Sequence, residues 1–231
     1  MKAPLPDVQA LTDEPILGWR VWHLSVEPGT GPRLRPAGSG LDGASEWPPM
    51  RASIARCGAH PLRSWRRRDH PAPDADCTCG IYASRSLADF ERGVPAYPPP
   101  CVVGMVSLWG RVIEHSRGWR AELAYPARLR LVCALCAWYE PGTGTPEVVH
   151  TFGGLMFALC TDHRGGIELP GGRRTTPTDR DPGVLQAQLL GAYAVDLAPS
   201  EAVEGLCARA RAQMPASYVP VIRPVRQGPQ G

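Results

Sequence analysis

The chain has 231 residues, 43% of them hydrophobic, and a formal net charge of only +3. Its 25 glycines and 26 prolines exclude an all-helical protein, and the absence of any apolar run of about 18 residues excludes a membrane-spanning helix. Lys2 is the only lysine, which is typical of a GC-rich genome. The number of arginines therefore does not by itself predict a polyanionic partner.

The N-terminal segment, residues 1–17, is acidic and contains prolines, and it has no apolar core of a signal peptide. We expect this segment to be flexible and the chain to remain in the cytoplasm, where thiols stay reduced. Eight cysteines in that compartment favour metal ligation over disulfide bonds.

The first half of the chain predicts short elements separated by loops. Residues 18–24 form an aromatic, β-branched run that predicts a strand, and residues 27–49 predict mostly loop. The next expected elements are a helical turn or two at 50–57, a strand at 80–83, a short helix from 86 to 92 and a rigid proline-rich connector at 94–100.

The clearest β signal is a hairpin with strands at 101–113 and 119–125 and a polar turn at 114–118. A further strand at 129–133 and another at 155–159 each lead directly into a cysteine-containing turn.

The C-terminal part predicts a loop at 164–183 followed by two helices. Asp181 and Pro182 supply an N-cap and a first-turn proline for a helix that continues to Leu190. Ser200 caps a second helix whose apolar residues fall on one face as far as Met214. The tail, residues 215–231, is proline-rich and predicts disorder.

Four residues have the spacing of a structural zinc site: Cys133, Cys136, Cys160 and His163. A two-residue gap lets two side chains of one tight turn converge on a tetrahedral ion, and two such turns complete the shell. Because each pair follows a strand-like run, the pattern predicts a zinc-ribbon or treble-clef-like knuckle. The alternative is that these are small buried side chains and a surface histidine.

A second constellation consists of Cys57, His70, Cys77 and Cys79, with His60 as an alternate ligand. Its spacing is that of no common zinc finger, but the loop around it is too polar and turn-rich to bury three cysteines in a core. We expect a second zinc ion here. A redox-active thiol pair or unconnected surface cysteines are the alternatives.

Three stretches, at 70–83, 103–110 and 118–122, read HPAPDADCTCGIYA, VGMVSLWG and GWRAE. Together they resemble a group of uncharacterised proteins from high-GC bacteria and their phages. The resemblance spans about residues 18–131 together with the pairs Cys133/Cys136 and Cys160/His163. It implies zinc dependence.

Residues 80–88, GIYASRSLA, also resemble the middle motif of ADP-ribosyltransferases of the poly(ADP-ribose) polymerase and diphtheria-toxin type. The resemblance implies that Tyr82 would stack on the nicotinamide of NAD, His23 would hold a ribose, and Glu122 or Glu114 would orient a ribose hydroxyl. Alternatively, Tyr82 is a packed strand residue and Glu122 a surface charge of the hairpin.

The only dense basic cluster consists of Arg63, Arg66, Arg67 and Arg68 around Trp65. Guanidinium planes and an indole can bind phosphate and stack on a base. A solvated surface is the alternative, and the bias towards arginine favours it.

Taken together, the sequence predicts an α+β protein. Its β-rich part, 18–131, carries the second cysteine cluster and is followed by a zinc module at 132–170 and a helical segment at 171–214. We expect a non-catalytic binding or regulatory protein that is stabilised by one or two zinc ions and contacts nucleic acid or another protein. An NAD-dependent ADP-ribosyltransferase is the alternative.

Overall fold

The computed structural model describes residues 8–27, 29–37, 46–57, 70–89, 98–139, 142–200, 206 and 222–225. Within them strands dominate and one α-helix is present, α1 (Pro182–Tyr193). The strands are β1 (Val8–Glu27), β2 (Gly31–Pro36), β3 (Ser53–Ile54), β4 (Ile81–Ser84), β5 (Val102–His115), β6 (Gly118–Leu131), β7 (Val148–Phe152), β8 (Leu155–Leu159), β9 (Ile167–Leu169), β10 (Arg173–Arg174), β11 (Thr176–Thr178), β12 (Asp196–Leu197) and β13 (Arg223–Pro224).

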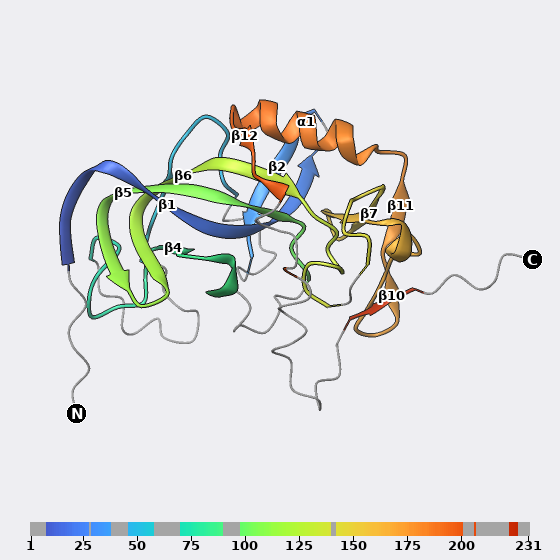
Figure 1. The fold of residues 1–231 in the computed structure, drawn as a ribbon, viewed down its shortest axis with the longest axis horizontal. Helices are drawn as coiled ribbons and strands as arrows, with labels where there is room; N and C mark the ends of the chain where they lie inside the picture. Colours follow the sequence, from blue (N-terminus) through green and yellow to red (C-terminus); the bar gives the residue numbers. More distant parts are fainter. Residues whose placement is uncertain are drawn as a thin grey trace, which may run out of the picture.

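Four strands of the main sheet close on one another (Figure 1). β5 pairs with both β1 and β6. β4 pairs with the same two strands: its Ser84 is opposite Trp19 of β1, and its Ile81 is opposite Ala121 of β6. The predicted hairpin is therefore confirmed, and it forms half of a small closed arrangement of strands. Closure removes the exposed edges that these long strands would otherwise present.

The hairpin strands are longer than the sequence predicts. The connection is a two-residue turn, and the strand expected at 129–133 is the end of β6 rather than a separate element. Pro126 lies within β6, next to a register shift between Met105 and Val106 of β5, where a proline without an N–H group is tolerated within a sheet.

Several N-terminal expectations are wrong because the decisive partners are distant in sequence. β1 begins at Val8, opposite Ile113, so residues 8–17 form a strand instead of the expected flexible N-terminus. The expected loop at 27–49 contains β2, which pairs with β1. The helical turn expected at 50–57 is replaced by β3, which pairs with β6.

Other connecting segments are also more structured than expected. The short helix predicted at 86–92 is a 3₁₀ turn at Leu87–Asp89, and residues 90–97 lie outside the described part. The expected loop at 164–183 contains β9, β10 and β11, which pair with β13, β9 and β7 respectively. The strand at 155–159 is confirmed as β8.

The first C-terminal helix is confirmed. The Asp181 carboxylate accepts a hydrogen bond from the Val184 N–H at 2.8 Å, as an N-cap does, and Pro182 begins the helix. α1 lies over β2 and β6 (Figure 1). The second predicted helix falls outside the described residues except for Ser200 and Leu206, and so does most of the predicted disordered tail. No helix in the described ranges has the length and apolarity needed to cross a membrane.

The main core lies between the sheet and α1. It contains Trp22 of β1, Phe157 of β8 and Tyr193 of α1, all at most 1% exposed. β8 pairs with β1 as well as with β7, so the expected boundary at residue 131 does not separate two sheets. The α+β class holds, with a cysteine and histidine cluster packed into this core.

Candidate metal centres

The first centre forms where two strands end. β6 leads into Cys133, and residues 134–139 turn so that the Ala137 N–H donates to the Cys133 carbonyl at 3.0 Å. β8 leads into Cys160, and a 3₁₀ turn places His163 beside it. Because each pair immediately follows a paired strand, the sheet fixes the positions of both turns, as the sequence predicted.

The ligand atoms of this centre have the spacing of a tetrahedral site. Nδ1 of His163 lies 3.4 Å from Sγ of Cys133, 3.4 Å from Sγ of Cys136 and 3.3 Å from Sγ of Cys160, and the last two sulfurs are 3.5 Å apart. With metal–sulfur bonds of about 2.3 Å, a tetrahedral ion requires roughly 3.8 Å between two sulfurs and roughly 3.6 Å between sulfur and nitrogen. The four side chains fit such an ion.

All four side chains are buried and at most 5% exposed. Burial lowers the pKa of His163, but the hydrogen bond to Cys133 and its charge outweigh this effect and raise it to about 9. The hydrogen bond with Cys133, together with burial, raises the pKa of Cys160 to about 11. Protons and a metal ion therefore compete for these ligands, and metal uptake releases protons.

The second centre is assembled on β6 by two short strands. Cys57 follows β3, which pairs with Leu123 and Ala124 of β6. Cys77 and Cys79 lie in the turn before β4, which pairs with the neighbouring part of β6. The four predicted ligands are thus brought together from three separate points of the chain.

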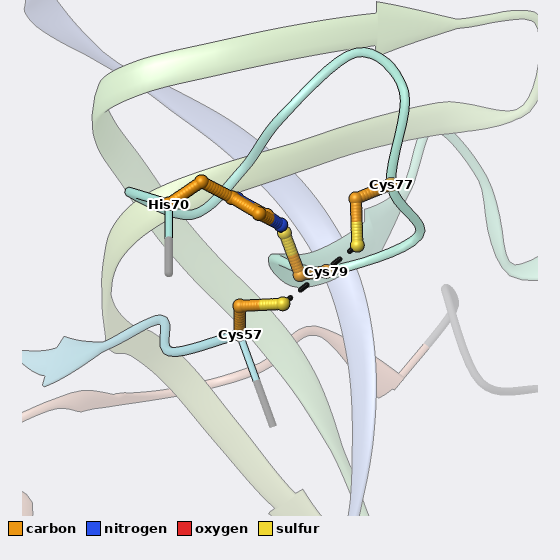
Figure 2. Close-up of side chains that lie close together, drawn as sticks. All are labelled: Cys57, His70, Cys77 and Cys79. Carbon is orange, nitrogen blue, oxygen red and sulfur yellow. Dashed lines mark hydrogen bonds between the residues drawn. The ribbon is translucent and has the colours of Figure 1, made fainter. Parts of the chain in front are cut away.

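Figure 2 shows the four side chains of this centre pointing towards one another. The sulfurs of Cys57 and Cys77 are 3.8 Å apart, and Nδ1 of His70 lies 4.0 Å from the sulfur of Cys79. All four ligand atoms lie within 4.8 Å of one another, and the side chains are half-buried. This cluster also fits a tetrahedral ion, with slightly longer separations than the first. The expected alternate ligand His60 lies outside the described residues.

The thiols of the second centre differ in acidity. Hydrogen bonding to the backbone of Cys79 lowers the pKa of Cys77 to about 7, whereas burial raises the pKa of Cys79 to about 11. Cys77 is therefore the thiol that ionises most readily, and ionised thiols are the form that binds metal.

Arg120 of β6 supports this centre, and sequence reasoning did not find it. Arg120 is 9% exposed, and its guanidinium donates to the backbone carbonyls of Asp74, Cys77 and Cys79, the last at 3.1 Å. A divalent ion with three thiolates carries a net negative charge, which a buried guanidinium complements. No local pattern marks Arg120, because it is more than 40 residues from the turn that it holds.

Comparisons of this chain with protein-family models, with curated proteins and with solved structures give no match. The resemblance to uncharacterised proteins of high-GC bacteria and their phages therefore remains a prediction, and so does the resemblance to ADP-ribosyltransferases.

Each residue suggested by the resemblance to ADP-ribosyltransferases makes its own structural contacts. Tyr82 is 43% exposed, and its hydroxyl donates to the Thr78 carbonyl at 2.5 Å. Glu122 accepts a hydrogen bond from the Arg111 N–H at 3.2 Å, beside Gly110, whose φ of 77° marks a bulge in β5. This carboxylate stabilises a bend of the hairpin.

The other suggested glutamate, Glu114, forms an ion pair with Arg85 near the hairpin turn. The predicted basic cluster, comprising Arg63, Arg66, Arg67, Arg68 and Trp65, lies outside the described residues.

His23 is a core residue, only 3% exposed. Burial lowers its pKa to about 4, and the charge of Arg35 acts in the same direction, while a hydrogen bond to the Pro99 backbone partly opposes them. Because the folded-state pKa lies below the unfolded value of about 6.5, the unfolded chain binds the proton more tightly. His23 therefore destabilises the fold as pH falls from about 6.5 to about 4.

We expect His23 to reduce the free energy of unfolding by about 2 kcal/mol between pH 7 and pH 5. Urea unfolding of the wild type and of His23→Gln at several pH values measures this effect. Any loss of metal in acid is common to both proteins. The difference between their slopes of unfolding free energy against pH therefore isolates the contribution of His23. Parallel stability profiles in this pH range would contradict the assignment.

Proposed function

We propose that the protein is a zinc-stabilised, non-catalytic binding or regulatory protein, with a structural zinc ion in each of its two Cys₃His clusters. The observation that supports this proposal is that four protein ligand atoms converge in both clusters within 4.8 Å of one another. Four protein ligands complete a tetrahedral shell and leave no position for water or substrate, whereas catalytic zinc keeps one position open.

The ligand set favours zinc over other divalent metals. Three thiolates and one imidazole are soft ligands that suit zinc, whereas magnesium and calcium prefer oxygen ligands. Measurement of the metal content of freshly purified, reduced protein tests this point. We expect about two zinc ions per chain, and a metal content near zero would refute the proposal.

The order of the ligands along the chain connects the second centre to a binding role. Cys57 and His70 are both ligands, and the twelve residues between them include Arg66, Arg67 and Arg68. A metal ion at this centre holds the two ends of the segment together. We propose that the segment contacts single-stranded nucleic acid through its arginines and Trp65.

Replacing Arg66, Arg67 and Arg68 together by glutamine tests this interface. We expect weaker binding to a single-stranded oligonucleotide, and a slope of log affinity against log salt that is shallower by about two, because three phosphate contacts are lost. The matched control replaces Arg173, Arg174 and Arg180, which are exposed and carry the same total charge. Equal effects of the two triple variants, or salt-insensitive binding, would favour a protein partner instead.

No contact among the described residues favours the ADP-ribosyltransferase alternative. An assay for release of nicotinamide from NAD distinguishes the two functions. We expect no release, and release that is abolished by Glu122→Gln would overturn our proposal.

A further inference from the structure

A cavity of about 330 Å³ lies between the turn at residues 50–52, the hairpin β5–β6 and the end of α1. It is separate from both metal centres, and none of the residues proposed above to bind metal or nucleic acid lines it. The lining residues are Met50, Arg51, Ala52, Trp109, Tyr125, Tyr193 and Ala194. Its size is at the lower end of the range for small-molecule pockets, about 300–1,000 Å³.

Two aromatic side chains of the hairpin face the cavity, and a third aromatic residue packs behind them. Trp109 and Tyr125 lie on the same face of the hairpin, because Trp109 is opposite Leu123 and Tyr125 is opposite Ser107. The ring of Tyr193 on α1 lies 6.3 Å from that of Tyr125 between centroids, but Tyr193 is fully buried, so it supports the wall from behind. Flat aromatic surfaces of this kind favour a flat, apolar ligand.

The backbone around the cavity is held in an unfavourable conformation. Met50 has a φ of 57° and Ala194 a φ of 49°, and among the described residues these are the two non-glycine residues with positive φ. Residues other than glycine adopt this region at a cost, and such positions cluster at functional sites. Met50 is also 69% exposed to solvent.

One hydroxyl group connects these two backbone positions. Tyr125 accepts a hydrogen bond from the Met50 N–H at 2.9 Å and donates one to the Tyr193 carbonyl, next to Ala194, at 2.8 Å. The hydroxyl of Tyr193 in turn donates to the Trp47 carbonyl at 2.6 Å. The walls of the cavity are therefore fixed before any ligand enters, which reduces the entropic cost of binding.

Arg51 is the only charged residue among those that line the cavity. A guanidinium at the rim repels cations and attracts an anionic group, while the aromatic walls contact the rest of the ligand. We propose that this cavity binds a small molecule with a flat aromatic ring and an anionic substituent. A nucleoside monophosphate and an aromatic carboxylic acid share this chemistry. The inference goes beyond the proposed function, because it depends neither on the metal ions nor on the basic segment.

Ligand-observed NMR titration tests this site with indole-3-acetate, with the neutral analogue 3-methylindole and with UMP. We expect Trp109→Ala to weaken indole-3-acetate binding by about tenfold or more, because the largest contact surface is removed. Arg51→Gln is expected to weaken indole-3-acetate binding and leave 3-methylindole binding unchanged. Tighter binding of UMP than of indole-3-acetate identifies a nucleotide as the source of the ligand, and the reverse order identifies an aromatic acid.

Met50→Gly separates loss of the site from loss of the fold. Glycine adopts a φ of 57° without strain, so we expect this variant to melt a few degrees higher than the wild type while it binds indole-3-acetate less tightly. The proposal is overturned if the wild type binds neither UMP nor indole-3-acetate. It is also overturned if Trp109→Ala and Met50→Gly bind it as tightly as the wild type, or if Arg51→Gln affects the acid and 3-methylindole equally.

Discussion

Cys133→Ser is expected to prevent the folded protein from accumulating, whereas Cys57→Ser is expected to be tolerated. Cys133 is fully buried and its sulfur is one of four ligands inside the main core, so the substitution leaves the remaining ligands buried without their ion. Structural zinc contributes about 10 kcal/mol or more to small zinc domains, which is comparable to the whole stability of an ordinary domain. Cys57 is half-buried, and solvent can reach the ligands left behind there.

Soluble yield and metal content measure this difference. We expect about two ions per chain in the wild type, about one in Cys57→Ser, and mostly insoluble protein for Cys133→Ser. The matched control is Cys101→Ser, because Cys101 is fully buried but belongs to neither cluster, and its thiol donates to the Met156 carbonyl. If Cys133→Ser were no less soluble than Cys101→Ser, the first centre would not be a structural metal site.

Gly104→Ala is expected to destabilise the fold by about 3 kcal/mol or more. A Cβ atom at Gly104 of β5 would lie 2.0 Å from the carbonyl oxygen of Arg128 on β6. The obstacle is backbone rather than a side chain that can rotate away, so the two central strands must separate locally. The position adjoins the register shift of the hairpin, where the strands approach each other closely.

Thermal or urea unfolding of Gly104→Ala measures this effect, and Gly191→Ala provides the control. Gly191 lies in α1 with nothing within 4 Å of the added atom, and alanine is the better helix former by about 1 kcal/mol. The control is therefore expected to gain stability. If both variants were as stable as the wild type, the close approach of β5 and β6 at this point would be wrong.

The features that the sequence predicts correctly are those whose signal is local. The hairpin has two β-rich runs on either side of a turn, and α1 has its N-cap and proline side by side at Asp181 and Pro182. The two-residue gaps of the first cluster, each directly after a strand, likewise predict which side chains meet. The second cluster was expected from composition alone, because three cysteines and a histidine lie in a polar loop.

The features that the sequence misses depend on distant partners. β2 contains glycine and proline, and β3 is only two residues long, so both become strands only through their pairing with β1 and β6 respectively. β1 extends ten residues beyond its apolar run because β5 lies alongside it. Similarly, nothing in the local sequence indicates that the Glu122 carboxylate accepts a hydrogen bond from the Arg111 N–H at the bulge of β5.

The contacts of Arg120 have a consequence for the order of assembly. The carbonyls of Cys77 and Cys79 are gathered by a guanidinium that comes from β6, more than 40 residues further along the chain. A nascent chain can therefore present these two thiols in the right geometry only after β6 has paired. The second centre would then bind its ion late in folding. A bound ion there would indicate that the hairpin β5–β6 has formed.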